Sequence, residues 1–163
     1  MAGTLYIPKD LHPEQLFDTL LSQIRALLGN ETDEIACMAN AAAALMEVFS
    51  HHWIGFYRVS GNELVLGPFQ GPIACTRIQK GKGVCGTAWL KNETLVVDDV
   101  DQFPGHIACS ALSKSEIVVP LRNKKGEVMA VLDIDSDQYK AFDASMQKGL
   151  EQLCSMLSTH MYR

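Results

Sequence analysis

The chain has 163 residues, of which 47% are hydrophobic and 20% are charged, so we expect one globular domain with a core large enough to enclose a small-molecule pocket. Its 14 basic and 19 acidic residues give a formal net charge of −5, and no basic stripe is present. These values argue against nucleic acid and anionic membranes as partners.

Apolar residues at helical spacing predict three long helices. The first begins near Pro13 and stops at Gly29, the second follows an N-cap at Thr32 and Asp33, and the third begins at Asp143. Their apolar faces comprise, in order, Phe17, Leu20, Leu21, Ile24, Leu27 and Leu28; Ile35, Met38, Ala42, Leu45 and Phe49; and Met146, Leu150, Leu153 and Leu157.

The region between the second and third helices has strand-like composition. Strands are expected at residues 53–59, 63–69, 73–78, 94–97, 116–121 and 127–135, with a short helix near residues 84–90. Short turns at Gly61-Asn62 and Lys125-Gly126 favour antiparallel hairpins. The pattern predicts an α+β fold, with a mostly antiparallel central sheet and the N- and C-terminal helices packed on one side.

The segment WIGFY places two aromatic residues on one face of a strand. Trp53, Gly55 and Tyr57 share that face, and Ile54 and Phe56 share the other. Aromatic residues in strands usually belong to the core. Because Gly55 has no side chain, however, we also expect a gap between the two rings that would fit an apolar group of a ligand.

The segment GKGVCG matches the glycine pattern of a dinucleotide-binding loop, with Gly81, Gly83 and Gly86 at the required spacing. No alternation of strands and helices follows it, so a tight turn that leads into a short helix is the favoured interpretation. In either case the start of that helix places free backbone N–H groups near Cys85.

The segment DIDSD alternates three acidic residues. It resembles the start of a calcium loop, but Gln138 and Ala144 stand where an EF-hand requires Gly and Glu, which excludes that motif. Asp133 and Asp135 fall on one strand face, where they are either solvated or part of a pocket. In a pocket, their crowding would raise one pKa and create a proton donor, or the pair would anchor a substrate ammonium.

Five cysteines are too few and too scattered for a disulfide scaffold, which indicates a reducing compartment. The N-terminus shows no secretory leader and the chain no membrane-spanning run, so we expect a cytoplasmic protein. Cys37 and Cys154 fall on or beside the helical apolar faces and are expected to pack in the core.

The remaining three cysteines allow two interpretations. With His106, the cysteines Cys75, Cys85 and Cys109 form a nominal zinc set, although their spacing is atypical for structural zinc and we expect no metal. A nucleophilic or redox cysteine fits better, because Cys109 lies in a long connection, residues 103–116, rich in small residues. His106 is expected to anchor this loop rather than act as a base.

Six motifs in order resemble the free methionine-(R)-sulfoxide reductases, a family of single GAF domains in which the ligand pocket is an active site. The matching segments are WIGFY, ELVLGPFQGPIAC, GVCGTA, FPGHIAC, SEIVVPL and VLDIDS, between Ala39 and Asp143. The resemblance implies that residues 1–163 form one catalytic GAF-like domain.

The resemblance also implies roles for individual residues. Cys109 corresponds to the catalytic cysteine, Cys75 to the usual resolving cysteine, and Cys85 to a third cysteine that is an alternative resolving partner. Glu116, Asp133 and Asp135 correspond to carboxylates that bind the substrate amino group and the sulfoxide oxygen, and Trp53 and Tyr57 to aromatic walls of the pocket. One position departs from the family, since Ser110 stands where an acidic residue commonly follows the catalytic cysteine.

The implied reaction is reduction of free L-methionine (R)-S-oxide to L-methionine. Glu116, or else Asp135, would protonate the sulfoxide oxygen while Cys109 becomes a sulfenic acid, and Cys75 or Cys85 would then form a disulfide with Cys109. No bound cofactor is expected, and NADPH-linked thioredoxin would reduce the disulfide. By resemblance, a homodimer is also expected. A GAF-type ligand or redox sensor without catalysis is the alternative function.

Overall fold

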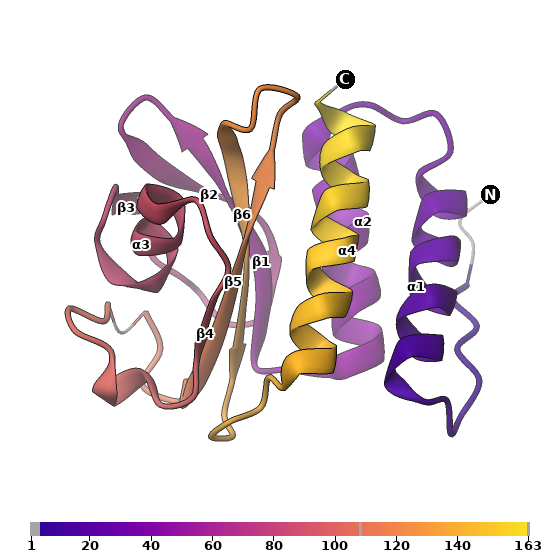
Figure 1. Cartoon of the computed structure of the whole chain (residues 1–163), viewed down its shortest axis with the longest axis horizontal. Helices are drawn as coiled ribbons and strands as arrows, with labels where there is room; N and C mark the ends of the chain where they lie inside the picture. Colours follow the sequence, from indigo (N-terminus) through magenta and orange to yellow (C-terminus); the bar gives the residue numbers. More distant parts are fainter. Residues whose placement is uncertain (1–3, 108, 163) are drawn as a thin grey trace.

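A six-stranded antiparallel sheet forms the centre of the protein (Figure 1). The structure is a computed structural model that describes residues 4–107 and 109–162. In chain order the strands are β1 Trp53–Ser60, β2 Glu63–Gln70, β3 Arg77–Gln79, β4 Leu95–Val97, β5 Ser115–Arg122 and β6 Val128–Ser136. Their order across the sheet is β3-β2-β1-β6-β5-β4, which places β1 and β6 at the centre.

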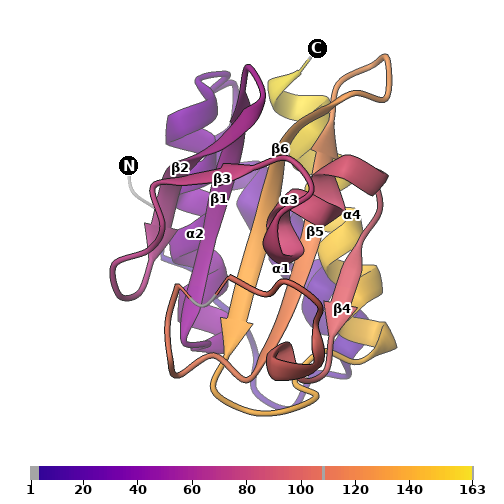
Figure 2. The ribbon, with the colours of Figure 1, turned by 90° about the vertical axis from the view of Figure 1, so that its left-hand side faces the viewer.

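Helices cover both faces of this sheet. The helices α2, Glu34–Phe49, and α4, Ala144–Met161, pack on one face, and α1, Pro13–Leu28, packs outside them (Figure 1). On the other face lie α3, Gly83–Lys91, and the connection from β4 to β5, which contains the 3-10 helix η1, Val100–Gln102 (Figure 2). The N- and C-terminal helices therefore share one side of the sheet, as predicted.

The predicted helix starts are confirmed, and local hydrogen bonds explain them. The Ala36 amide donates to the Asp33 carboxylate over 2.9 Å, and the Met146 amide donates to the Asp143 carboxylate over 2.8 Å. Each aspartate thereby satisfies an N–H group that has no partner within its helix. Pro13 is the first residue of α1, where a missing N–H costs nothing.

Alternation along the strands divides the apolar side chains into two cores. Ile54 and Phe56 of β1 face α2 and α4, together with Leu132 and Ile134 of β6. The alternate positions of these strands face α3, where Trp53 and Tyr57 belong to a second, smaller core. Asp133 and Asp135 alternate with Leu132 and Ile134 and therefore lie on this second face.

The segment predicted as a strand at residues 73–78 is mostly a loop. Only Arg77–Gln79 pair with β2, and residues 71–76 lie outside the sheet. Gly71 has a φ of 130° and begins this loop; a side chain there would place its Cβ 2.8 Å from the His52 carbonyl oxygen. The strand-like composition of this segment was misleading because side chains of β1 bind carbonyl groups of the loop.

The glycine-rich segment forms a tight turn into α3, and the dinucleotide interpretation is wrong. A Cβ at Gly86 would lie 2.4 Å from the Gln79 carbonyl oxygen, so the glycine permits a close approach of two backbone segments. Every strand pair in the described part of the chain is antiparallel. The parallel strand–helix–strand unit that a dinucleotide needs is therefore missing from it.

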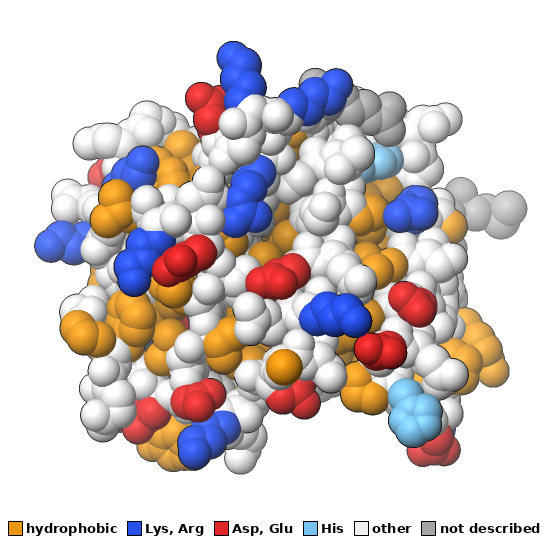
Figure 3. Space-filling view, viewed as in Figure 1, with side chains coloured by type: hydrophobic (Ala, Val, Ile, Leu, Met, Phe, Trp, Pro, Cys, Tyr) orange, Lys and Arg blue, Asp and Glu red, His pale blue; other side chains and the backbone are white. Residues whose placement is uncertain are grey.

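The hairpin predictions are confirmed at Gly61-Asn62, between β1 and β2, and at Lys125-Gly126, between β5 and β6. On the face shown in Figure 3, acidic and basic side chains are interspersed, which agrees with the absence of a basic stripe in the sequence. None of the described helices is both long and apolar enough to span a membrane.

Candidate active site

Three carboxyl groups meet on the sheet face beneath α3 because of the strand register. Asp135 of β6 pairs with Trp53 of β1 on one side and with Glu116 of β5 on the other. Asp133, two residues earlier in β6, shares their face and pairs with Gly55. Directly opposed residues in neighbouring strands have Cβ atoms about 5 Å apart, so this register alone brings the acids together.

These carboxyl groups line a small pocket of about 40 Å³, which is room for about three water molecules. Its walls come from β1, the loop before β3, the start of α3, and the connection that contains Cys109. The lining side chains include Trp53, Tyr57, Cys85, His106, Cys109 and Ile73. A buried pocket with convergent acids and a sulfur atom at its edge is the strongest candidate for a functional site in the described residues.

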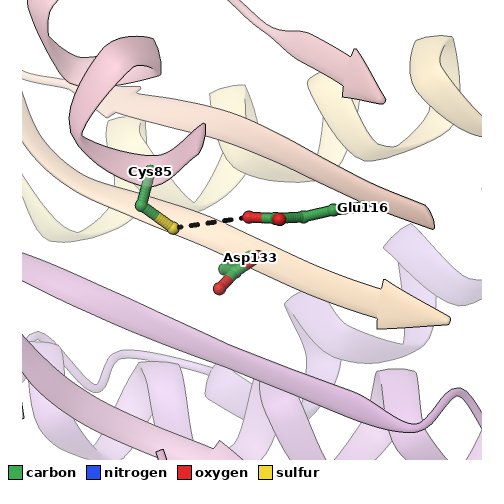
Figure 4. A group of neighbouring side chains, drawn as sticks. All are labelled: Cys85, Glu116 and Asp133. Atoms are coloured by element: carbon green, nitrogen blue, oxygen red, sulfur yellow. Dashed lines mark hydrogen bonds between the residues drawn. The ribbon is translucent and has the colours of Figure 1, made fainter. Parts of the chain in front are cut away.

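Cys85, Glu116 and Asp133 form the floor of the pocket (Figure 4). They come from α3, β5 and β6 and are 3%, 5% and 6% exposed. The Cys85 thiol lies 3.9 Å from Glu116 Oε1, and a carboxyl oxygen of Asp133 lies within 4.8 Å of the donor atoms of both side chains. On the open side of Glu116, His106 Nε2 lies 3.6 Å from Oε2.

Burial governs the ionisation of these groups. It raises the pKa of Glu116 well above the usual range, and the negative charge of Asp135 raises it further. Burial and the charges of Asp135 and Glu116 likewise raise the pKa of Asp133. The pKa of the Cys85 thiol is also well above normal, first because of burial and then because of the neighbouring acids. The floor therefore favours protonated, neutral groups.

Asp135 occupies a more polar position near the pocket mouth. Burial raises its pKa to about 6, while a hydrogen bond from Ser113 and the charges of His106 and His52 act in the opposite direction. Asp135 thus titrates at about pH 6. The acids expected from the sequence to share a face do so, inside a pocket rather than in solvent.

Cys75 and Cys109 are joined by a disulfide at the pocket mouth, with their Cα atoms 5.6 Å apart. The bond links the loop before β3 to the connection between β4 and β5. Cys109 is exposed and Cys75 is partly buried, whereas Cys85 remains a buried free thiol. Of the two resolving partners left open by the sequence, Cys75 is the one that this structure brings to Cys109.

The aromatic residues do not leave the gap that the sequence suggested. The Trp53 ring lies over Gly55 and stacks with Tyr57 at 5.9 Å between ring centroids; a Cβ at Gly55 would meet the Trp53 ring at 2.4 Å. Gly55 therefore accommodates the indole itself.

Both aromatic side chains also hold the loop that contains Cys75. Trp53 Nε1 donates to the Pro72 carbonyl over 3.1 Å, and the Tyr57 hydroxyl donates to the Cys75 carbonyl over 2.9 Å. These two bonds position Cys75 and explain why residues 71–76 do not continue as a strand.

Ser110 pairs with His52, a residue to which no sequence motif points. Its hydroxyl lies 2.9 Å from Nε2 of His52, the residue that precedes Trp53. The bond ties the cysteine-bearing connection to β1 directly beside Cys109. Ser113, which lines the pocket and lowers the pKa of Asp135, was also missed. Neither residue belongs to a recognisable motif, and only the pairing of distant segments brings them to the site.

The four-residue zinc set is not assembled. Cys75 and Cys109 are bonded to each other, so their sulfur atoms are not free thiolates. A different group of donors, Cys85, Glu116 and Asp133, has ligand atoms within 4.8 Å of one another. Cys37 and Cys154 are buried on the opposite side of the sheet, in the core to which they were assigned.

Comparison with known proteins places this arrangement in a family. A family model described as a GAF domain matches residues 10–161. GAF domain-containing protein A of Dictyostelium discoideum is 56% identical over 158 residues, covering 96% of this chain and 99% of that protein. A free methionine-R-sulfoxide reductase of Saccharomyces cerevisiae is 38% identical over 157 residues, covering 91% of this chain and 87% of that protein.

A solved structure is also very similar. It is the X-ray structure of the free methionine-R-sulfoxide reductase from Neisseria meningitidis in complex with its substrate. The TM-score is 0.92 at 47% sequence identity, and the match covers 98% of this chain and 95% of that one. The likeness therefore extends over the fold and all the strands that line the pocket.

Proposed function

Since this chain belongs to the GAF-domain family and resembles its free methionine-R-sulfoxide reductases over nearly its full length, we propose that it reduces free methionine-R-sulfoxide to methionine. The observation that supports this most directly is the Cys75–Cys109 disulfide, at the mouth of a pocket lined by three buried carboxyl groups. We propose that residues 1–163 act as one catalytic domain.

The acids explain a preference for a free amino acid. A substrate α-ammonium placed against Asp133 and Asp135 would compensate negative charge that is unfavourable in the empty pocket. A methionine sulfoxide residue inside a peptide has no such charge. Trp53 and Tyr57 provide the apolar walls for the side chain of the substrate.

The chemical step requires a nucleophile and an acid. The Cys109 thiolate attacks the sulfoxide sulfur, and a proton is delivered to the departing oxygen, which leaves methionine and a Cys109 sulfenic acid. Glu116 is the proposed donor because burial raises its pKa well above the usual range, which favours the protonated acid. Asp135, with a pKa of about 6, is the second candidate.

In the next step, the sulfenic acid on Cys109 is converted to a disulfide. The Cys75 thiol attacks the sulfenic acid sulfur, a Cys75–Cys109 bond forms, and the oxygen leaves as water. Cys75 is favoured over Cys85 for two reasons. It lies in the loop that reaches Cys109, and Cys85 is a buried thiol whose raised pKa disfavours the thiolate.

The exposed disulfide suits reduction by a dithiol protein, for which we propose thioredoxin with NADPH as the electron source. Exchange transfers two electrons, regenerates both thiols and oxidises the partner. No bound cofactor takes part in these steps. A cytoplasmic location, where such a disulfide is reversible, and a homodimer are further predictions.

A coupled assay tests the proposal. Purified protein is mixed with thioredoxin, its reductase and NADPH, and either the R or the S epimer of free methionine sulfoxide is added. We expect NADPH consumption with the R epimer, much less with the S epimer, and little with a peptide-bound sulfoxide.

Cys109→Ser is the decisive variant, and Cys154→Ser, in the core on the other sheet face, is its matched control. The proposal requires that Cys109→Ser loses turnover while Cys154→Ser keeps it. A wild-type protein that binds methionine sulfoxide without consuming NADPH would instead be a sensor.

A further inference from the structure

The cluster on the pocket floor combines donor atoms that the proposed reaction does not need together. Cys85, Glu116 and Asp133 offer one sulfur and two oxygen atoms, all within 4.8 Å of one another (Figure 4). Zinc binds thiolate sulfur at about 2.3 Å and carboxylate oxygen at about 2.0–2.2 Å, so ligands of one ion lie roughly 3–4 Å apart. The observed Cys85–Glu116 separation of 3.9 Å already falls in that range.

A second observation is a buried oxygen atom of the cluster that has no hydrogen-bond partner. Asp133 Oδ1 is buried without a hydrogen bond, in a side chain that lines the pocket and is 6% exposed. In the described part of the chain, Lys and Arg form ion pairs with Glu14, Glu34, Glu63 and Glu93, and none of these pairs includes Asp133 or Glu116. A buried polar atom without a partner costs free energy, which a bound cation would recover.

We propose that Cys85, Glu116 and Asp133 bind a divalent transition-metal ion of the zinc class, and that this ion reversibly inhibits the enzyme. On binding, the Cys85 thiol and any protonated carboxyl group release their protons, and one S–metal and two O–metal bonds form without electron transfer. His106, beside Glu116, is a nitrogen donor suitable for a fourth position. A thiolate with imidazole and carboxylates is a donor set that zinc accepts and that calcium and magnesium do not.

Inhibition follows because the ion binds Asp133, which also holds the substrate ammonium, and this half of the inference rests on the proposed function. Metal and methionine sulfoxide would then compete for Asp133. The ion is a competitor and not a cofactor, since no step of the proposed reaction uses it.

Titration of the oxidised protein with Co²⁺ tests the site independently of activity. With Cys75 and Cys109 held as a disulfide, a thiolate-to-cobalt charge-transfer absorption at one equivalent is expected from Cys85. It should disappear in Cys85→Ser and persist in Cys37→Ser, which removes a buried thiol on the other sheet face. Asp133→Asn should weaken binding more than about tenfold, because even outer-shell partners of metal ligands contribute that much.

No charge-transfer band with the wild-type protein, or a band that persists in Cys85→Ser, would overturn the site. Zn²⁺ should displace Co²⁺, and free methionine sulfoxide should displace both. If cobalt binds through Cys85 but methionine sulfoxide does not displace it, the metal site stands and the competition is wrong. Turnover in a zinc-free coupled assay reports separately on the proposed reaction.

Discussion

Glu116, Asp133 and Asp135 are buried in the pocket, where the charged carboxylate form is unfavourable. Ionisation of these residues therefore lowers the stability of the folded state. The pKa of Asp135 rises from 3.8 to about 6 in the folded protein. The folded state therefore binds this proton more tightly than the unfolded state, so the contribution of Asp135 to stability is present at low pH and lost as the pH rises through about 6.

Asp135→Asn should consequently stabilise the protein above pH 6 and weaken substrate binding. A shift of about two units corresponds to about 3 kcal/mol at most, which sets an upper limit on the gain in unfolding free energy at pH 8. Urea denaturation at pH 8 and at pH 4 would measure it, and the difference between variant and wild type should nearly vanish at pH 4. A variant less stable than wild type at pH 8 would show that Asp135 is favourably ionised in the fold.

The His52–Ser110 contact joins the connection that contains Cys109 to the residue before β1. We expect His52→Ala or Ser110→Ala to lower kcat/KM about 3- to 10-fold, which is the effect of one net hydrogen bond of about 1 kcal/mol. Because the two residues act through one contact, the double variant should be no worse than either single variant. Ser110→Asp, which can pair with His52, should retain activity. Additive losses in the double variant would exclude a shared role.

At the scale of whole elements, α1 is the helix farthest from the site, and one glycine controls its packing. Gly149 of α4 lies against Phe17 of α1, and a Cβ there would be 2.2 Å from the aromatic ring. Gly149→Ala should force the two helices apart and lower the free energy of unfolding by about 1–3 kcal/mol. Activity should remain, since the pocket lies on the other side of the sheet.

Chemical denaturation and the coupled assay would separate these two effects, with the exposed Gln152→Ala in the same helix as control. Loss of activity in folded Gly149→Ala would mean that α1 communicates with the pocket through the sheet.

The elements also show which features could be predicted from the sequence. Helix starts at Asp33 and Asp143 depend on hydrogen bonds to residues three positions later, so local sequence specifies them. The shared face of Asp133 and Asp135 follows from strand alternation.

Other features depend on contacts between distant segments and could not be predicted in this way. Whether the aspartates are buried depends on α3 and on the connection that covers them. The loop at residues 71–76 was misassigned because Trp53 and Tyr57, some twenty positions earlier, bind its carbonyl groups. The position of the Trp53 indole over Gly55 and the His52–Ser110 hydrogen bond could not be predicted from the local sequence either.

For the whole molecule, the disulfide and the pocket lie on the sheet face that bears α3. The helices α1, α2 and α4 form layers on the opposite face (Figures 1 and 2). Leu112, three residues after Cys109, is 63% exposed. An exposed apolar side chain beside a disulfide is suited to contact with the protein that reduces it.

Leu112→Glu should therefore raise the KM for thioredoxin about fivefold, the equivalent of about 1 kcal/mol, and leave turnover with dithiothreitol unchanged. Leu90→Glu alters a leucine of α3 that is 59% exposed and serves as the matched control. An equal loss with both reductants would place Leu112 in substrate turnover rather than in docking.

The most direct test of the proposed reaction is a single turnover without reductant. The fully reduced protein is mixed with one equivalent of free methionine-R-sulfoxide, and methionine, free thiols and disulfide-linked peptides are quantified. We predict one methionine formed and two thiols lost per chain, with Cys75 and Cys109 in the linked peptide and Cys85 still alkylatable after unfolding. Thiols that remain intact with no methionine formed, or a linkage that excludes Cys109, would contradict the assignment of Cys109 as the nucleophile.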